Sequence, residues 1–272
     1  MRIGVCANPQ DWVTVAEKGY DYIETNFASI ANSSDEDFAF MLAQKEKAGL
    51  DVEACMGYFP GTFKLYAYDE TTGEASPAFA DIEKQVYEHS EKGFSKASKL
   101  GIKIAVIGSG AARNIPDNMK HEVAEAQFTR VLEICAEVAQ KYGARIVIEP
   151  LKAGETNYIN TLADGLALCR KINNPAICVL NDFYHSALGG ETPDALFDSG
   201  DLLIHTHISK LNRHCPNLEE DGEILLPMVQ NLVNAGYNDR MSLECVFSPD
   251  VSTALENART FAAAIKAVKP TK

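Results

Sequence analysis

Eight short runs of apolar and β-branched residues, spread along the whole chain, constrain the fold more than any other feature. The last four are almost continuously hydrophobic, as is typical of parallel strands that are covered on both faces. Dividing 272 residues by eight leaves about 34 per repeat, enough for a strand, a crossover helix and two short connections. The runs are RIGVC (2–6), DYIET (21–25), DVEACM (51–56), KIAVI (103–107), RIVIE (145–149), ICVLND (177–182), LLIHTHI (202–208) and MSLECV (241–246).

Segments with helical spacing of apolar residues lie between these runs. Three of them, at 35–49, 81–101 and 125–143, each close on a glycine, which suits the end of a helix. The sequence TLAD at 161–164 resembles an N-terminal capping box with Asp in place of the usual Glu or Gln, and it predicts a helix start after the fifth strand.

The strict alternation of strand and helix predicts a (β/α)8 TIM barrel formed by a single domain over residues 1–272. An open, doubly wound parallel sheet is the structural alternative. Neither GxGxxG nor GxxxxGK[ST] follows the first strand, so the phosphate-binding loop typical of that alternative is missing. The barrel is therefore the favoured fold.

Two predicted loops are longer than a barrel requires, and long loops at a barrel mouth often act as lids. One runs from Gly57 to about Phe79 and the other from Ser209 to about Gly222. The first is rich in aromatic residues, which predict either contact with substrate or packing on the protein's own helices or a neighbouring subunit. Its aromatic residues are Tyr58, Phe59, Phe63, Tyr66 and Tyr68.

Charge and cysteine content narrow the range of partners. A formal net charge of −13 repels nucleic acid and anionic membranes. The seven cysteines are odd in number and lack CxxC spacing, which favours reduced thiols and a cytoplasmic location. The N-terminus lacks the pattern of a signal peptide, and no stretch approaches the roughly 18 apolar residues of a membrane span.

Polar side chains at the ends of four consecutive strands are the main candidates for chemistry. In a parallel barrel the carboxyl ends of the strands meet at the mouth where reactions occur. Glu149, Asp182, His207 and Glu244 lie at or near these ends, about one strand-to-strand repeat apart. We expect the four side chains to converge.

Three converging carboxylates would repel one another unless a cation lay between them. Three oxygen ligands and one imidazole suit a hard or borderline dication better than a structural zinc site. We expect one ion per chain, with Mn²⁺ favoured and Mg²⁺, Co²⁺ or Zn²⁺ as alternatives. The competing interpretation is four separate polar groups, each satisfied by backbone amides.

Further polar residues flank this set. Glu155, His185 and Arg213 are candidates for support of the site or for contact with substrate hydroxyls. His205 shares a strand face with His207 and should also point inward, either toward the site or into the barrel core. Glu24 ends the second strand and is a candidate for a substrate hydroxyl or for a structural salt bridge.

Several of these motifs resemble a known family, the xylose-isomerase-like barrel superfamily, and within it the D-tagatose 3-epimerase and D-psicose 3-epimerase group. The motifs are IEP at 148–150, ND followed by FYH at 181–185, HTHIS at 205–209 with Arg213, and LE at 243–244. The resemblance implies a ketose isomerase or epimerase that acts on a small carbohydrate. The net charge and the lack of a long apolar stretch predict a soluble enzyme without nucleic acid or membrane partners, open to homo-oligomer formation.

The resemblance also assigns roles to individual residues. Glu149, Asp182, His207 and Glu244 would bind the metal, and Glu149 and Glu244 would also be the acid/base pair that moves a proton through an enediolate. The positions implied for substrate contact are Glu155, His185 and Arg213.

The chain departs from the group's usual pattern in two places. Residues 6–9, CANP, lack an aromatic side chain near the substrate, and KAGETNYIN at 152–160 lacks the usual arginine. Alternatives to an epimerase are a lyase of the inosose dehydratase type on the same site and a non-catalytic carbohydrate-binding barrel. An endonuclease IV-like phosphodiesterase is disfavoured because strands three and four end in Cys55-Met56 and Ile107-Gly108, which supply no histidines for a metal cluster.

Overall fold

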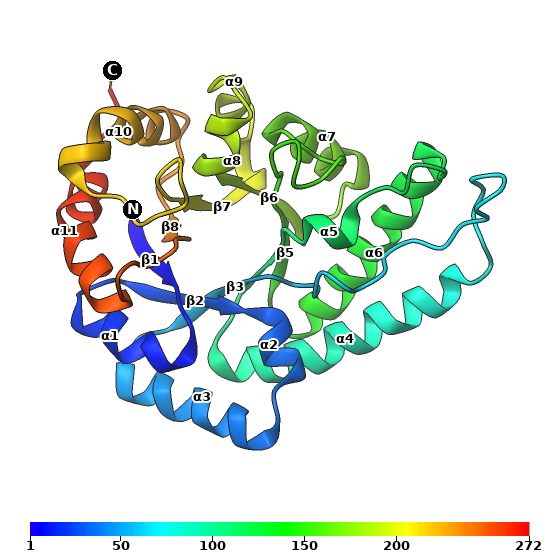
Figure 1. Cartoon of the computed structure of the whole chain (residues 1–272), viewed down its shortest axis with the longest axis horizontal. Helices are drawn as coiled ribbons and strands as arrows, with labels where there is room; N and C mark the ends of the chain where they lie inside the picture. Colours follow the sequence, from blue (N-terminus) through cyan, green and yellow to red (C-terminus); the bar gives the residue numbers. More distant parts are fainter. Residues whose placement is uncertain (272) are drawn as a thin grey trace.

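The strands of the computed structural model, which describes residues 1–271, form one closed parallel barrel. They pair in sequence order, and β8 pairs with β1 to complete the ring (Figure 1). In this last pairing Arg2 lies opposite Arg240 and Val5 lies opposite Leu243. The predicted TIM barrel is therefore confirmed. The strands are β1 (Arg2–Cys6), β2 (Tyr22–Asn26), β3 (Val52–Met56), β4 (Ile104–Ile107), β5 (Arg145–Ile148), β6 (Ile177–Asp182), β7 (Leu203–Ile208) and β8 (Arg240–Leu243).

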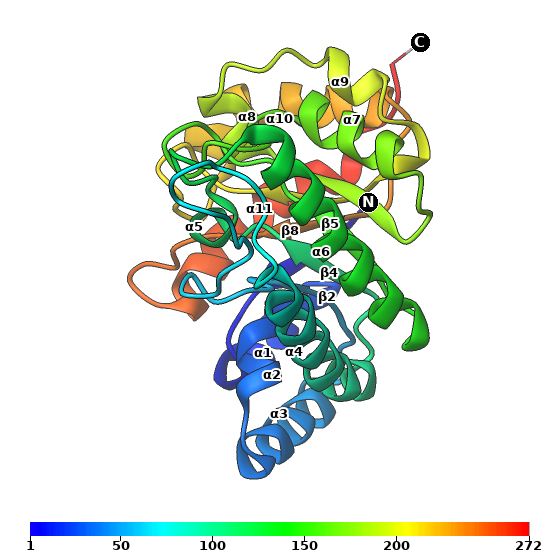
Figure 2. The same ribbon diagram turned by 90° about the vertical axis from the view of Figure 1, so that its right-hand side faces the viewer.

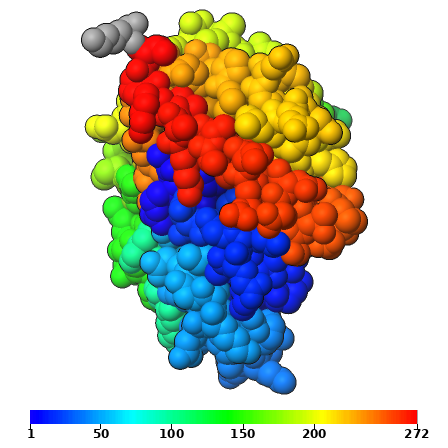
Figure 3. All heavy atoms as spheres, turned by 90° about the vertical axis from the view of Figure 1, so that its left-hand side faces the viewer, coloured from blue at the N-terminus to red at the C-terminus, as the bar shows by residue number. Residues whose placement is uncertain are grey.

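Helices surround the strands, as Figures 1 and 2 show from two sides. Figure 3 shows the C-terminal helix α11 lying against the N-terminal segments, where it contacts α1 and β1. Within residues 1–271, none of the helices combines the length and the apolar character needed to cross a bilayer. The helices are α1 (Trp12–Glu17), α2 (Phe27–Asn32), α3 (Asp35–Ala48), α4 (Phe79–Leu100), α5 (Gly110–Arg113), α6 (His121–Lys141), α7 (Leu162–Ile172), α8 (Phe183–Leu188), α9 (Asp194–Phe197), α10 (Leu218–Asn234) and α11 (Val251–Ala267), with short 3-10 turns at Pro9–Asp11 and Gly200–Leu202.

Local sequence signals explain most helix boundaries. Gly49 and Gly101 follow α3 and α4 with φ angles of 65° and 96°, a left-handed conformation that glycine adopts without the steric cost of a Cβ atom. The capping box of α7 is confirmed, since Asp164 N donates to Thr161 Oγ1 at 3.1 Å and Thr161 N donates to Asp164 Oδ2 at 2.9 Å. Gly143 closes α6 as expected: it has a φ of 69° and follows the C-cap residue Tyr142, and its N–H donates to Gln140 O at 3.1 Å.

Two apolar layers hold the barrel together. Inward-facing side chains of β3 to β7, among them Ile104, Val106 and Leu180, fill the barrel interior. Side chains on the outer faces of the strands pack against the helices in a second, larger cluster. Because side chains alternate between these layers along each strand, the polar residues at the strand ends are left facing the mouth.

Of the two long loops, the one after β3 has its predicted bounds and the one after β7 is shorter than predicted. The loop after β7 ends at Asn217 rather than near Gly222, because the Asn217 side chain accepts from Glu220 N at 2.8 Å and starts α10. The aromatic loop after β3 packs on its own chain beside α5 (Figure 2). There the Tyr58 ring is fully buried and stacks on Phe27, with ring centroids 4.1 Å apart. For Tyr58, packing explains the aromatic signal better than substrate contact.

Candidate active site

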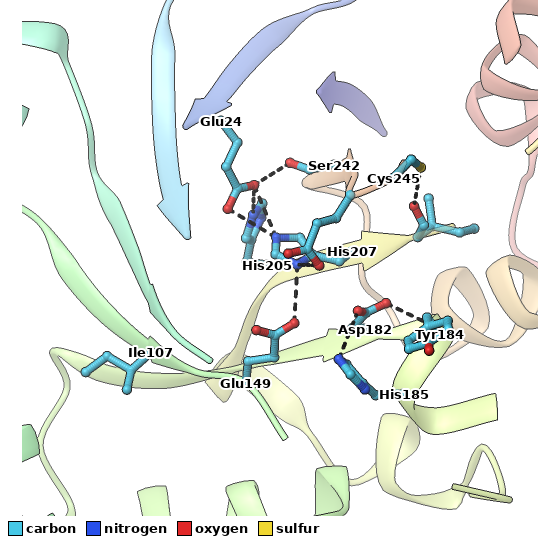
Figure 4. A network of polar contacts seen from close by, with 12 residues as sticks. Glu24, Ile107, Glu149, Asp182, Tyr184, His185, His205, His207, Ser242 and Cys245 are labelled. Atoms are coloured by element: carbon cyan, nitrogen blue, oxygen red, sulfur yellow. Dashed lines mark hydrogen bonds and ion pairs between the residues drawn. The ribbon is translucent and has the colours of Figure 1, made fainter. Parts of the chain in front are cut away.

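The four predicted strand-end residues meet at the mouth of the barrel. Figure 4 shows three of them, Glu149, Asp182 and His207. Asp182 is the last residue of β6 and His207 is the penultimate residue of β7, while Glu149 and Glu244 directly follow β5 and β8. One donor atom from each side chain lies within 4.8 Å of the donor atoms of the other three. The expected convergence is therefore present in the structure.

Two buried atoms in this group fit a cation. Glu149 Oε1 and His207 Nδ1 have no hydrogen-bond partner among residues 1–271 and lie 3.4 Å apart. His207 Nδ1 also lies 3.1 Å from Glu244 Oε2. A buried polar atom without a partner is costly in free energy. A dication at this point would accept lone pairs from all three side chains, so the donor set fits a divalent metal ion.

The two glutamates differ in their affinity for a proton. Burial and the nearby charge of Glu244 raise the pKa of Glu149 to about 7. Burial alone would also raise the pKa of Glu244, but the positive charges of His207 and Arg213 outweigh it and lower that pKa to about 2. Neighbouring carboxyl groups with separated pKa values are an arrangement suited to an acid and a base in one site.

Arg213 lies against the predicted metal ligands. Its guanidinium donates to Glu244 Oε2 at 2.8 Å and to Asp182 Oδ2, and it stacks over the Tyr184 ring at 4.3 Å from the centroid. The Arg213 backbone has a φ of 68°, an uncommon conformation for a residue with a side chain. The β7–α10 loop thus directs a fixed cation at two carboxylates of the site.

His185 and Glu155 form the side of the site next to Arg213. His185 is buried, its Nδ1 accepts from Lys152 N at 3.3 Å, and its Nε2 lies 3.6 Å from Asp182 Oδ2. Glu155 lies farther out, 4.0 Å from His185 Nε2, with 41% of its side chain exposed. The three predicted substrate-contact residues are therefore grouped along one edge of the four-residue set.

Glu24 and His205 lie behind the site rather than in its mouth. Both are fully buried, and His205 Nε2 lies 2.7 Å from Glu24 Oε2. Of the two alternatives for Glu24, the structure favours the structural one over contact with a substrate hydroxyl, because the Glu24 carboxylate has no exposed surface and contacts His205, His207 and Ser242. Glu24 therefore forms the structural salt bridge that was its other alternative, and His205 lies in the barrel core.

Two residues that support Glu149 were not anticipated. A Cβ atom at Gly108 would overlap Glu149 Oε2, so the carboxylate occupies space that only a glycine leaves open. Arg113 is fully buried and donates to the carbonyl oxygens of Tyr158 at 3.1 Å and Ile107 at 3.3 Å. The Ile107 carbonyl also accepts from Glu149 N at 3.2 Å, so Arg113 ties the end of β4 to the loop after β5.

Comparison with known proteins gives a consistent family and fold. Residues 13–269 match the family described as Xylose isomerase-like TIM barrel. The chain is 27% identical to D-psicose 3-epimerase of Agrobacterium fabrum over 208 residues, which cover 74% of this chain and 67% of that protein. It is 25% identical to 3-dehydro-D-guloside 4-epimerase of Escherichia coli over 203 residues, which cover 74% of each.

Solved structures agree in fold at lower identity. A D-psicose 3-epimerase crystallised in the presence of D-fructose superposes with a TM-score of 0.81 at 20% identity, covering 98% of this chain and 99% of that one. An L-ribulose 3-epimerase superposes with a TM-score of 0.78 at 18% identity, covering 97% and 94%. At these identities the structural similarity shows only that the fold is the same.

Proposed function

Because the chain belongs to the xylose isomerase-like TIM barrel family, we propose that it is a metal-dependent sugar epimerase. The reaction would invert one carbon next to the carbonyl of a small keto sugar. The observation that carries the proposal is the pair of carboxylates, Glu149 and Glu244, which share one buried site and have pKa values on opposite sides of the ordinary one. The two sequence relatives, both named as epimerases of keto sugars, support it.

Four side chains would hold the metal: Glu149, Asp182, His207 and Glu244. Mn²⁺ is the favoured ion, because three carboxylates and one imidazole suit a dication between hard and borderline. When bound, a dication would polarise the substrate carbonyl and make the neighbouring C–H more acidic.

The protein's own groups then account for the inversion. One of the two glutamates removes the proton from the carbon beside the carbonyl, and the other returns a proton to the opposite face. The two carboxylates reach the site from the ends of β5 and β8 and lie 3.4 Å and 3.1 Å from His207 Nδ1. Arg213, His185 and Glu155 would bind substrate oxygens along the adjoining edge.

Isotope exchange combined with product analysis tests the proposed reaction. The metal-stripped protein, before and after reloading with Mn²⁺, is incubated in D2O with D-fructose, D-psicose, D-tagatose, a 3-keto-glycoside and an inosose. We expect the reloaded protein to place deuterium on the inverted carbon of at least one keto sugar without loss of water. Formation of an ultraviolet-absorbing enone would favour the lyase alternative. A lack of exchange with every compound would contradict both reactions.

The pKa of Glu149 predicts how the stability of the metal-free protein depends on pH. Burial raises this pKa to about 7 in the folded state, against about 4.3 in an unfolded chain. A raised carboxyl pKa favours folding at low pH, and this contribution is lost as the pH rises through the folded value. The melting temperature Tm of the metal-free protein should therefore fall between about pH 5 and pH 8.

Metal binding should reverse that trend, because the bound carboxylate must be ionised. We expect Mn²⁺ to raise Tm more at pH 8 than at pH 6 and to release a proton on binding at pH 6, measurable by calorimetry in buffers of different ionisation enthalpy. The Glu149→Gln variant is the control, since it should lose the part of the pH dependence between these values. An unchanged pH profile in that variant would show that Glu149 does not titrate there.

A further inference from the structure

A chain of hydrogen bonds inside the barrel lies directly behind His207. Glu24 Oε2 lies 2.6 Å from Ser242 Oγ and 2.7 Å from His205 Nε2, and Glu24 Oε1 lies 3.1 Å from His207 Nε2 (Figure 4). Tyr22 Oη lies 2.8 Å from Ser242 Oγ. All of these side chains are fully buried, so water does not compete for them.

The direction of each hydrogen bond follows from the donors available. An ionised carboxylate only accepts hydrogen bonds, and one hydroxyl and two imidazole rings surround Glu24 within hydrogen-bond distance. Ser242 must therefore donate to Glu24, and its oxygen is left to accept from Tyr22. His205 and His207 must likewise donate their Nε2 protons.

The orientation of His207 follows from this assignment. In the neutral form that a metal binds, His207 donates its Nε2 proton to Glu24 and carries its lone pair on Nδ1, the atom that lies 3.1 Å from Glu244 and 3.4 Å from Glu149. A histidine that binds a metal through one nitrogen commonly donates the other N–H to a carboxylate, which fixes the ring and raises its basicity.

The packing around Tyr22 fixes the outer end of this series of hydrogen bonds. A Cβ atom at Gly4 would overlap the Tyr22 ring, so the phenol reaches Ser242 through space that a glycine provides. Gly4 pairs with Tyr22 on one side and with Ser242 on the other in the barrel register. The hydrogen bond between Tyr22 on β2 and Ser242 on β8 therefore passes over Gly4 of β1.

We propose that Glu24 is a positioning residue, which presents His207 Nδ1 to the metal and is itself held by Ser242 and Tyr22. The proposal rests on the proposed function only in assuming that the site takes a dication, and it applies whichever sugar is the substrate. Glu24 contacts no substrate atom and moves no proton in the reaction. Its effect is on the affinity of the site for metal.

The test is the dissociation constant of Mn²⁺ for Glu24→Gln, measured by calorimetry and by the electron paramagnetic resonance signal of free Mn²⁺. The amide keeps the size of the side chain but replaces one accepting oxygen with a donor, which opposes donation from His207 Nε2. Loss of such an outer carboxylate weakens metal binding by about 10- to 100-fold. We expect a loss of that size and recovery of kcat at saturating Mn²⁺.

Control variants separate positioning from general destabilisation. Glu191→Gln alters another partly buried carboxylate, which accepts from Leu162 N at 2.7 Å away from the site, and should leave Mn²⁺ affinity unchanged. Ser242→Ala keeps both histidine contacts of Glu24 and should weaken Mn²⁺ binding by a smaller factor. It provides the measurement if Glu24→Gln does not fold.

The outcomes distinguish this inference from the proposed function. Wild-type Mn²⁺ affinity in Glu24→Gln, or in Ser242→Ala if only that variant folds, would overturn the positioning role and leave the epimerase proposal intact. Weaker Mn²⁺ binding in a protein that exchanges no sugar proton would support the positioning role and contradict the epimerase. A wild-type protein that binds no dication would overturn both.

Discussion

Replacing Glu244 with glutamine is expected to lower kcat by about a thousand-fold, within the range that a positioned acid or base contributes. Glutamine has nearly the same size and keeps one oxygen toward the site, but it cannot take up or return a proton. The ion pair with Arg213, at 2.8 Å, is lost at the same time. Steady-state kinetics at saturating Mn²⁺ measure the effect on turnover separately from weaker metal binding.

Isotope exchange with each epimer gives this prediction a sharper form. If each glutamate serves one face of the reacting carbon, Glu244→Gln should still exchange the proton of one epimer with solvent and fail with the other. Glu133→Gln on α6, where the side chain is 44% exposed, is the matched control and should behave as wild type. Full activity in Glu244→Gln with only a lower Tm would show that Glu244 has a structural role and no acid/base role.

Replacing Gly108 with alanine is expected to reduce kcat/KM by at least about 100-fold, the cost of displacing a reacting group by about 1 Å. The added Cβ atom would overlap Glu149 Oε2, and Glu149 is 4% exposed, so its carboxylate must move within a packed site. Gly108 does not have a positive φ, and alanine therefore adds no backbone strain. We expect Tm to change little while activity is lost.

Gly61, in the loop after β3, provides a matched control for that substitution. A Cβ atom at Gly61 would meet its nearest neighbour, Ala111 Cβ, at an ordinary contact distance of 3.8 Å. Gly61→Ala should keep both activity and Mn²⁺ affinity. Wild-type kinetics in Gly108→Ala would mean that the position of Glu149 is not critical to the reaction.

Most of the barrel could be predicted because its strands carry their own signal. Runs such as RIVI and ICVLND are buried on both faces, so burial requires nearly every residue to be apolar up to the polar strand end. The short helices α2, α5, α8 and α9 were not predicted, since they span only four to six residues. A segment of one or two turns is too short to show a helical period.

The residues of the site likewise fall into those that the sequence could reveal and those that only the fold reveals. Glu149, Asp182, His207 and Glu244 could be found because each is a polar residue at the end of an apolar strand. Gly108 carries no such signal, and its importance depends on a contact with a side chain 41 positions later (149 minus 108). Arg113 reads as an ordinary surface cation in the sequence, and only the fold shows that it is buried among carbonyl groups.

Closure of the barrel by the β1–β8 pairing has a consequence for how this scaffold can diversify. The ligand candidates all come from β5 to β8, whereas β1 to β4 contribute residues behind and beside them, such as Glu24 and Gly108. The loops after β1 and β3 therefore border the mouth without supplying any of the four ligands. Substitutions there could change which molecule fits while leaving the reacting groups in place. Changes in the β1–β4 half of the barrel can in this way alter the substrate while the β5–β8 half keeps the same reaction.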